Sequence, residues 1–217
     1  MKRSLQREKA YRHLRSMLLH GGLRPGMRLG ETEWAERLGV HRGALREAFV
    51  LLAHEGLLMP GARGGYFVPI LEQADLDEVL ELRLALERGA LRRLARAGEP
   101  VGTKALRATC QVMRQMVELD MPVGHAEADR KFHEGLVELA DNRRMIRAYH
   151  QAPLLIIASE YMTPAERRGA MTQTLRDHER ICDLLEAGRF DAVAELLEQH
   201  LKSNPSALAT LNQTMTK

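Results

Sequence analysis

Hydrophobic residues between positions 31 and 57 recur at helical spacing in two short segments. The residues on these apolar sides are Trp34, Ala35 and Leu38 in the first segment and Leu45, Ala48, Phe49 and Leu52 in the second. Gly39-Val40 separates the segments and predicts a tight turn, and Gly56 is typical of the cap that ends a helix. The pattern therefore predicts two short helices that pack through their apolar sides.

The outward side of the second segment is basic near its start, where Arg42, Gly43 and Arg46 lie. A short helix with a buried flank and a basic leading edge fits the major groove of DNA. We therefore expect these three residues to contact DNA, through bases or phosphates. For Arg46 the alternative is a surface ion pair with a neighbouring Glu.

Two short apolar runs follow, at residues 57–59 and 66–68, and a turn-rich segment separates them. This pattern predicts a two-stranded hairpin. Its tip carries Arg63 on Gly64 and Gly65, and glycine lets a backbone approach a groove closely. We expect the tip to contact the DNA backbone or the minor groove beside the site of the helix.

The flanks of this region complete a small domain. A helix is predicted over residues 4–20, and residues 27–29 can add a short strand to the hairpin. Residues 70–75 are the expected linker to the remainder of the chain. The first domain is therefore predicted over residues 1–70.

Residues from about Leu14 to Pro69 resemble the winged helix of the GntR family of bacterial transcription regulators. The matching residues are Leu23–Leu29, Glu31, Ala35, Leu38–Val40, Arg42, Arg46–Ala48, Leu52, Glu55–Leu57 and Gly64–Gly65. The resemblance implies a winged helix-turn-helix that binds DNA. His41, Gly43, Ala44 and Leu45 replace the family's usual Ser, Thr or Ser, Pro and Val, so the resemblance does not define the operator sequence.

From residue 75 onward the hydrophobic spacing is helical, without a convincing strand pattern. A capping-box motif lies at Thr163–Glu166. The helical patterns cover residues 75–97, 103–119, 124–140, 142–149, 171–187 and 191–203. The fold class is therefore mainly α, with a winged helix-turn-helix and small β-wing before an all-helical bundle over residues 71–217.

Charge is distributed unevenly along the 217 residues, whose net charge is +3. Residues 1–70 carry 12 Lys and Arg against 6 Asp and Glu, a net charge of +6, and the remainder carries −3. The basic part is the one with the groove-sized helix, as phosphate binding requires. A merely solvated basic face is the alternative explanation for charge alone.

The chain has neither an apolar signal segment at its start nor a run of about 20 apolar residues, so we expect a cytoplasmic protein without a membrane partner. Cys110 and Cys182 have neither zinc-finger nor redox spacing, and both fall on apolar helical stripes. We expect them to be reduced core residues.

Ionisable residues interrupt the apolar stripes of three predicted helices. Asp129 and His133 share one inward face, and His178 and His200 each lie on another. A single inward histidine is usually a satisfied core residue, but one carboxylate and three imidazoles facing one core are costly without a common partner. A divalent metal removes that cost. Zinc is the first expectation, with nickel, iron or manganese as alternatives.

The helical region resembles the FCD ligand-binding domain of FadR-subfamily regulators. The matching pieces are Glu81–Arg83 with Glu87, Asp129 with Phe132–His133, Leu139–Asn142, Asp177–His178 with Ile181, and Gly188 followed by His200–Leu201. In metal-containing members the Asp and three His bind the ion, which implies the same for these four residues. The resemblance also implies a small organic acid bound beside the metal.

Arg83 lies seven residues after Leu76 and so belongs to the buried side of its helix. Its guanidinium offers a fork for the carboxylate of that acid. The alternative is an internal ion pair with Glu87, four residues further on.

Together these features predict a DNA-binding transcription regulator, not an enzyme. A metal-bound small carboxylate in the second domain would control its affinity for an operator. One winged helix reads little DNA, so we expect a homodimer, formed through the helical domain, on a near-palindromic duplex. The alternatives are a hydrolase-type metalloenzyme and a regulator that senses metal without an organic ligand.

Overall fold

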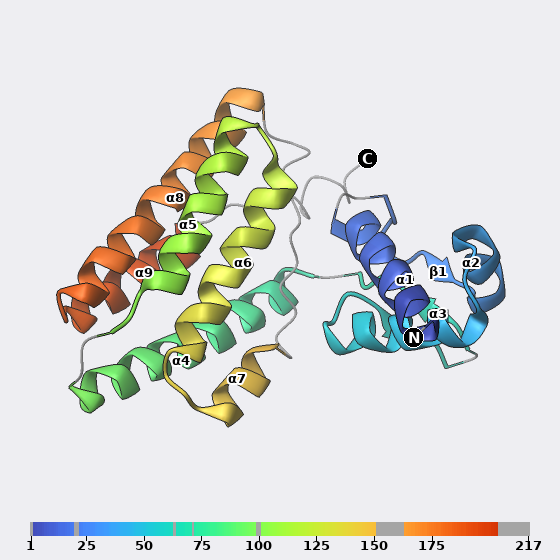
Figure 1. Ribbon diagram of the computed structural model, residues 1–217, viewed down its shortest axis with the longest axis horizontal. Helices are drawn as coiled ribbons and strands as arrows, with labels where there is room; N and C mark the ends of the chain where they lie inside the picture. The colour runs from blue at the N-terminus through green and yellow to red at the C-terminus, as the bar shows by residue number, and fades with distance from the viewer. Residues whose placement is uncertain are drawn as a thin grey trace. The chain divides into compact units, whose positions relative to one another are not determined.

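The computed structural model describes residues 2–19, 22–62, 64–70, 72–98, 101–150 and 163–203. These residues form two compact units, one within residues 1–72 and one within residues 73–203 (Figure 1). The first unit combines helices with a small sheet, and the second is helical throughout its described residues. The structure confirms the mainly α fold class.

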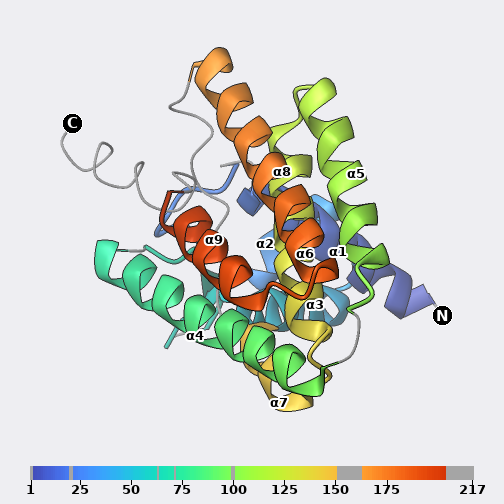
Figure 2. The same ribbon diagram turned by 90° about the vertical axis from the view of Figure 1, so that its left-hand side faces the viewer.

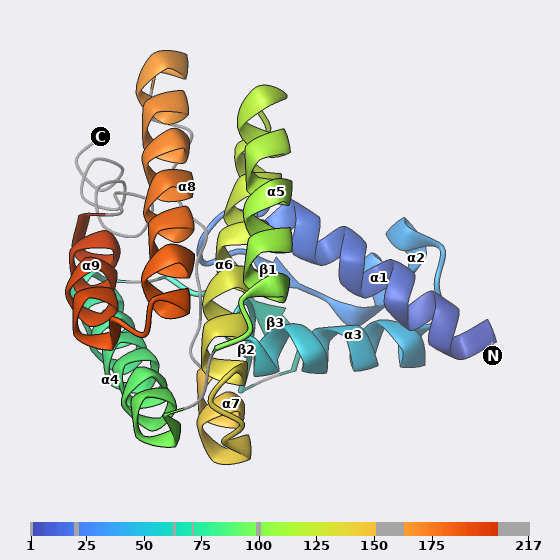
Figure 3. The ribbon, with the colours of Figure 1, turned by 60° about the vertical axis from the view of Figure 1, so that its left-hand side comes forward.

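The first unit is a three-helix domain with a β-wing. Its elements are α1 (Lys2–Leu19), β1 (Arg28–Leu29), α2 (Glu31–Leu38), α3 (Arg42–His54), β2 (Met59–Pro60) and β3 (Tyr66–Phe67). The strands form an antiparallel sheet in the order β1-β3-β2. Helix α3 packs against both α1 and α2, and Figure 3 shows α1 lying across α3. The short strand predicted at residues 27–29 is the sheet edge that pairs with β3.

The turn between α2 and α3 requires glycine at one position. Gly39 has φ +60°, in the left-handed region, and ends α2 by donating its N–H to Glu36 O at 3.1 Å. On the two sides of this turn, Trp34 of α2 and Leu45 and Phe49 of α3 are fully buried. Both helices therefore bury the apolar sides that their spacing predicts. The buried sides leave the start of α3 facing outward.

The second unit consists of α4 (Gln73–Ala97), α5 (Lys104–Glu118), α6 (Pro122–Glu138), α7 (Arg143–His150), α8 (Pro164–Glu186) and α9 (Phe190–Ser203). Helices α4, α6, α5, α8 and α9 form a closed ring in which each packs on the next, and α9 returns to α4 (Figures 2 and 3). Helix α6 also contacts α8 across the ring. The interior of this ring is the hydrophobic core of the second unit. It contains both cysteines, which are free and buried.

Helix α8 is longer than the sequence pattern suggests. The expected helix over residues 171–187 and the capping box at Thr163 belong to a single helix of 23 residues. The segment between them, residues 164–170, is largely exposed and has no large apolar side chain that repeats at helical spacing, so it lacks the pattern by which a helix is detected. The expected start at residue 171 is therefore wrong.

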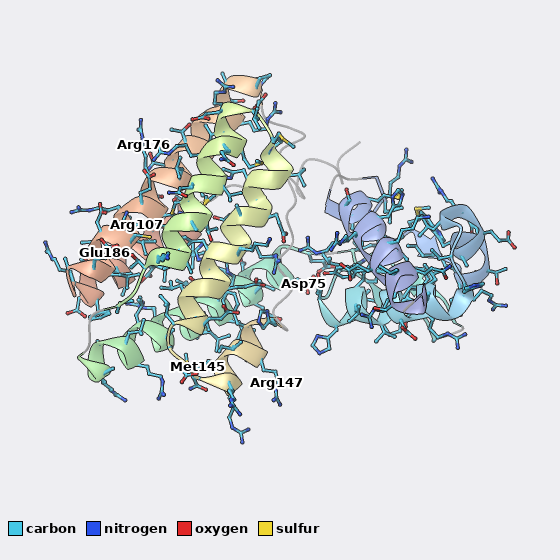
Figure 4. All side chains as sticks on the ribbon, viewed as in Figure 1. Asp75, Arg107, Met145, Arg147, Arg176 and Glu186 are labelled. Atoms are coloured by element: carbon cyan, nitrogen blue, oxygen red, sulfur yellow. The ribbon has the colours of Figure 1, made fainter. Side chains whose placement is uncertain are left out.

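Polar contacts join α5 to α8 outside the core. Arg107 donates to Asp183 Oδ1 at 2.9 Å and to Glu186 Oε2 at 2.7 Å, and Figure 4 shows Arg107 beside Glu186. The hydrogen bond from Arg107 lowers the pKa of Glu186 to about 2.

None of the helices in the described ranges is both long and apolar enough to cross a membrane.

Replacing Thr163 by Ala should destabilise the second unit modestly. Thr163 Oγ1 accepts from Glu166 N at 3.3 Å, and Glu166 Oε2 accepts from Thr163 N at 2.9 Å, so the substitution removes one half of a capping box. We expect the free energy of unfolding to fall by about 1 kcal/mol. Urea titration followed by circular dichroism measures it. Thr172→Ala is the control, since this hydroxyl only back-bonds to Arg168 O within the helix; equal losses in both variants would contradict the capping role.

Candidate functional site

The structure brings Asp129, His133, His178 and His200 together inside the helical ring. Helix α6 supplies the first two, one turn apart, and α8 and α9 supply one each. The three histidine Nε2 atoms form a triangle whose sides are 3.2, 3.3 and 3.3 Å. Asp129 Oδ1 lies between 3.5 and 3.8 Å from the same three atoms.

The opposite ring nitrogens have partners that orient the imidazoles. His133 Nδ1 lies 2.8 Å from Glu87 Oε2, and His200 Nδ1 lies 3.1 Å from Asp177 Oδ2. His178 Nδ1 lies 3.2 Å from the Met113 sulfur, a weak acceptor. A carboxylate accepts a hydrogen bond from a protonated Nδ1, so in the neutral rings of His133 and His200 the Nε2 lone pair faces the centre of the cluster.

The donor set fits a divalent metal ion. Metal–nitrogen bonds of about 2.0–2.1 Å place neighbouring nitrogens about 3.4 Å apart on a tetrahedral ion and about 3.0 Å apart on an octahedral one, which brackets the observed triangle. Asp129 Oδ1 is buried and has no hydrogen-bond partner among the described residues. Several lone pairs that converge in a buried space, with a carboxylate oxygen left unsatisfied, are stabilised by a cation at their centre.

Electrostatics favours the ligating form of two members of the cluster, Asp129 and His178; for His133, burial lowers the pKa but the carboxylates of Glu87 and Asp129 more than offset this and raise it. Burial alone would raise the pKa of Asp129, but the imidazoles, His133 foremost, hold this pKa well below its ordinary value. Burial also holds the pKa of His178 well below the ordinary value for histidine. Asp129 is therefore an anion and His178 a neutral ring, which are the forms that bind metals.

Arg83 on α4 occupies a position beside this cluster. Its Nε donates to Glu87 Oε1 at 3.3 Å and to the Tyr149 hydroxyl at 3.2 Å, and Tyr149 in turn donates to Glu87 Oε1 at 2.7 Å. The ion pair with Glu87, the alternative role for Arg83, is thus present. Its Nη2 nevertheless is buried and has no partner among the described residues, so it can still bind an anion.

The predicted DNA-reading residues lie at the exposed start of α3. Arg42, Gly43 and Arg46 are all exposed. Arg46 forms the ion pair that the alternative anticipated, since its Nη2 lies 2.6 Å from Glu31 Oε2 and its Nε 3.0 Å from Glu31 Oε1. The Arg46 side chain is still 63% exposed, and ion pairs at such exposure contribute about 0–1 kcal/mol, so phosphate can replace Glu31 at low cost.

The backbone at the tip of the wing turns at Gly64 and Gly65, the two glycines noted in the sequence. Gly64 and Gly65 have φ of +83° and +79°, a region that other residues rarely adopt. A Cβ at Gly65 would also lie 3.1 Å from Leu29 O, which leaves it little room. Arg63, the predicted basic residue of the tip, lies outside the described residues.

Two residues close to the cluster, Tyr149 and His125, are absent from the predicted site. Tyr149 reads as one apolar position of a short helix, and its hydroxyl contact with Glu87 depends on how α7 packs. His125 is 5% exposed and its Nε2 has no partner among the described residues. It lies four residues before Asp129 and eight before His133, so the same helical spacing that indicates those two ligands would have indicated it as well.

A winged helix-turn-helix followed by a helical bundle with a buried polar cluster defines a class of two-domain transcription regulators. The model for "Bacterial regulatory proteins, gntR family" matches residues 6–68, and the model for the FCD domain matches residues 78–203. The chain belongs to the GntR family and carries an FCD domain, as the FadR subfamily does.

Known proteins agree with this assignment. An uncharacterized HTH-type transcriptional regulator of Bacillus subtilis, YdhC, is 27% identical over 197 residues, covering 88% of this chain and 85% of its own length. An HTH-type regulator from the TAR-I ttuE-ttuC' intergenic region of Agrobacterium vitis is 34% identical over 134 residues, 60% of this chain and 78% of its own. The solved structure of Escherichia coli McbR/YncC has the same fold, with a TM-score of 0.73 at 20% identity, over 97% of this chain and 99% of that one. These families and relatives are transcription regulators, so the chain is a regulator and not an enzyme.

Proposed function

We propose that a metal ion held by Asp129, His133, His178 and His200, with a small organic acid beside it, controls the affinity of the winged helix for an operator. The observation that carries this proposal is the convergence of three Nε2 atoms, 3.2–3.3 Å apart, on a carboxylate oxygen that has no other partner in the described part of the chain. Zinc is the first candidate, with nickel, iron and manganese next, because all accept imidazole and carboxylate ligands. The bound ion would supply a Lewis acid that anchors an anionic ligand.

The effector follows from what the four residues leave open. A six-coordinate ion with four protein ligands retains positions for exchangeable oxygens. Arg83 adds a buried Nη2 without a partner among the described residues. A carboxylate can therefore satisfy Arg83 Nη2 with a charge-assisted hydrogen bond, while Arg83 Nε keeps its contacts with Glu87 and Tyr149.

DNA recognition is proposed for residues 1–70, and effector binding and dimerisation for residues 71–217. Two copies related by a two-fold axis would read a near-palindromic operator in the cytoplasm. The residues proposed to contact DNA are Arg42, Gly43, Arg46, Arg63, Gly64 and Gly65. Arg42 and Arg46 would reach bases or phosphates of the major groove, and the wing tip the adjacent backbone or minor groove.

Fluorescence anisotropy tests the whole proposal. An operator is first selected from a random duplex library with the full chain, and its affinity is then measured with a panel of small carboxylates, with and without a chelator. We expect at least one acid to change operator affinity, typically by about 5–150-fold, and the chelator to abolish that change. Affinity that follows metal concentration but ignores every acid would identify a pure metal sensor and contradict the effector role.

Glu87→Gln should weaken metal binding about tenfold or more without removing a ligand. The carboxylate of Glu87 accepts from His133 Nδ1 and fixes that ring, and outer partners of this kind typically contribute about 10–100-fold to metal affinity. Competition against a chromogenic chelator measures the effect. Glu138→Gln, at a largely exposed position near His150, is the matched control. Equal affinities for Glu87→Gln and the unmodified chain would show that His133 needs no such support.

A further inference from the structure

Three buried polar atoms without partners among the described residues belong to the surroundings of the candidate metal centre. They are Asp129 Oδ1, Arg83 Nη2 and His125 Nε2. The proposed metal satisfies the first, and a carboxylate satisfies the second. Neither accounts for His125, and an unsatisfied buried polar group costs about 1–3 kcal/mol.

His125 lies on the side of α6 that faces the cluster. It precedes Asp129 by four residues, which is about one helical turn or 6 Å along the axis. The Asp129 carboxylate acts on its ring, which places His125 within electrostatic range of this proposed ligand. A molecule of a few carbon atoms bound at the cluster can therefore reach this ring.

The ring of His125 offers an acceptor and not a donor. Burial lowers its pKa, and the Asp129 carboxylate and the backbone of Met171 on α8 offset this only in part, so the ring is neutral at pH 7. Nε2 has no partner in the described part of the chain, so the interaction with the Met171 backbone falls to Nδ1, which carries the proton and donates it. The Nε2 lone pair then needs a donor that the described residues do not supply.

We infer that the effector is a hydroxy acid, whose hydroxyl donates to His125 Nε2 while its carboxylate binds at the metal and Arg83. This inference rests on the proposed function. A simple carboxylate has no proton to donate at neutral pH and would leave Nε2 unsatisfied. An amino acid has a donor, but its ammonium group would add a positive charge to a site that already holds a metal cation and the Arg83 guanidinium, and both repel it. The hydroxyl is the neutral donor that fits.

Isothermal titration of the full, zinc-loaded chain with matched acids tests this inference. The pairs are glycolate with acetate, lactate with propionate and malate with succinate, which differ in one hydroxyl. We expect at least one hydroxy acid to bind about tenfold or more tightly than its partner, because a site that hydrogen-bonds a hydroxyl rejects the analogue without one. His125→Leu should abolish that preference and leave the affinity for the deoxy acid within about twofold.

Two further variants separate selection from folding. His125→Gln retains an acceptor at a similar reach and should restore part of the preference, and His150→Leu, at an exposed position of the same unit, should change nothing. Zinc affinity should be the same in all of them, since His125 is not among the four clustered ligand atoms. Loss of zinc affinity in His125→Leu would make His125 a metal ligand and overturn the inference.

The remaining outcomes distinguish this inference from the proposal beneath it. If acids bind and change operator affinity but each pair binds equally, the role of His125 is wrong and the proposed function stands. If hydroxy acids are preferred equally by His125→Leu, another residue reads the hydroxyl and the inference is also wrong. If no acid binds the zinc-loaded chain, both fail.

Discussion

Replacing His178 by Ala should eliminate stoichiometric metal binding and, with it, the effect of a chelator on thermal stability. His178 contributes one of three converging Nε2 atoms. The free energy of metal binding at structural sites is about 10–16 kcal/mol, and the loss of one ligand should lower the affinity by at least about 1000-fold. In the unmodified chain, metal at about 100 times its Kd adds about 2.7 kcal/mol, and so raises Tm by about 5–10 °C relative to the chelated protein.

The measured quantity is the difference in Tm between metal-loaded and chelator-treated samples of each variant. The difference matters because the His178 ring stacks on Phe132, with centroids 4.0 Å apart, so Ala also leaves a cavity that lowers Tm in both states. His150→Ala, an exposed histidine of the same unit, should keep the full difference. A chelator-dependent shift that persists undiminished in His178→Ala would place the metal elsewhere.

Arg42→Glu should reduce operator affinity by about 100-fold, because it removes a cation from the leading edge of α3 and adds an anion that DNA phosphates repel. Arg42 is exposed at the first position of this helix. The dependence of log affinity on log salt concentration should also become shallower, by about 1 for each phosphate that the protein no longer neutralises. Anisotropy titrations between about 50 and 200 mM salt measure both quantities.

Arg176→Glu on α8 gives the matched charge reversal in the other unit, and it should alter operator affinity little. Arg46→Ala should have a smaller effect than Arg42→Glu, because it removes one positive charge without adding a negative one. Indistinguishable salt slopes for Arg42→Glu and Arg176→Glu would argue against α3 as the helix in the groove.

Hydrophobic spacing alone predicts most of the first unit. Trp34, Leu45 and Phe49 are buried as their periodicity requires, and Gly39 and Gly65 adopt the positive φ that their positions in turns suggest. These features are local, since each depends on residues within one helix or one turn. The Arg46–Glu31 pair is different, because it joins two helices and depends on how they cross.

The composition of the candidate site is partly predictable for the same reason. Ionisable residues on apolar stripes identify Asp129 and His133 because they lie one turn apart on a single helix, but only packing brings His178 and His200 to meet them. Tyr149 illustrates what spacing cannot show. Its hydroxyl hydrogen-bonds Glu87, 62 residues away in the sequence, and no periodicity distinguishes this tyrosine from an ordinary core residue.

Helix α4 extends a long way from the polar cluster toward its own N-terminus. Glu87, which contacts both His133 and Tyr149, lies 14 residues after the start of α4 at Gln73, a separation of about 21 Å along the helix axis. The first unit ends at Glu72, the residue directly before the start of α4. Because of this length, a tilt of α4 by about 5° about Glu87 would move its first residue, Gln73, by about 2 Å.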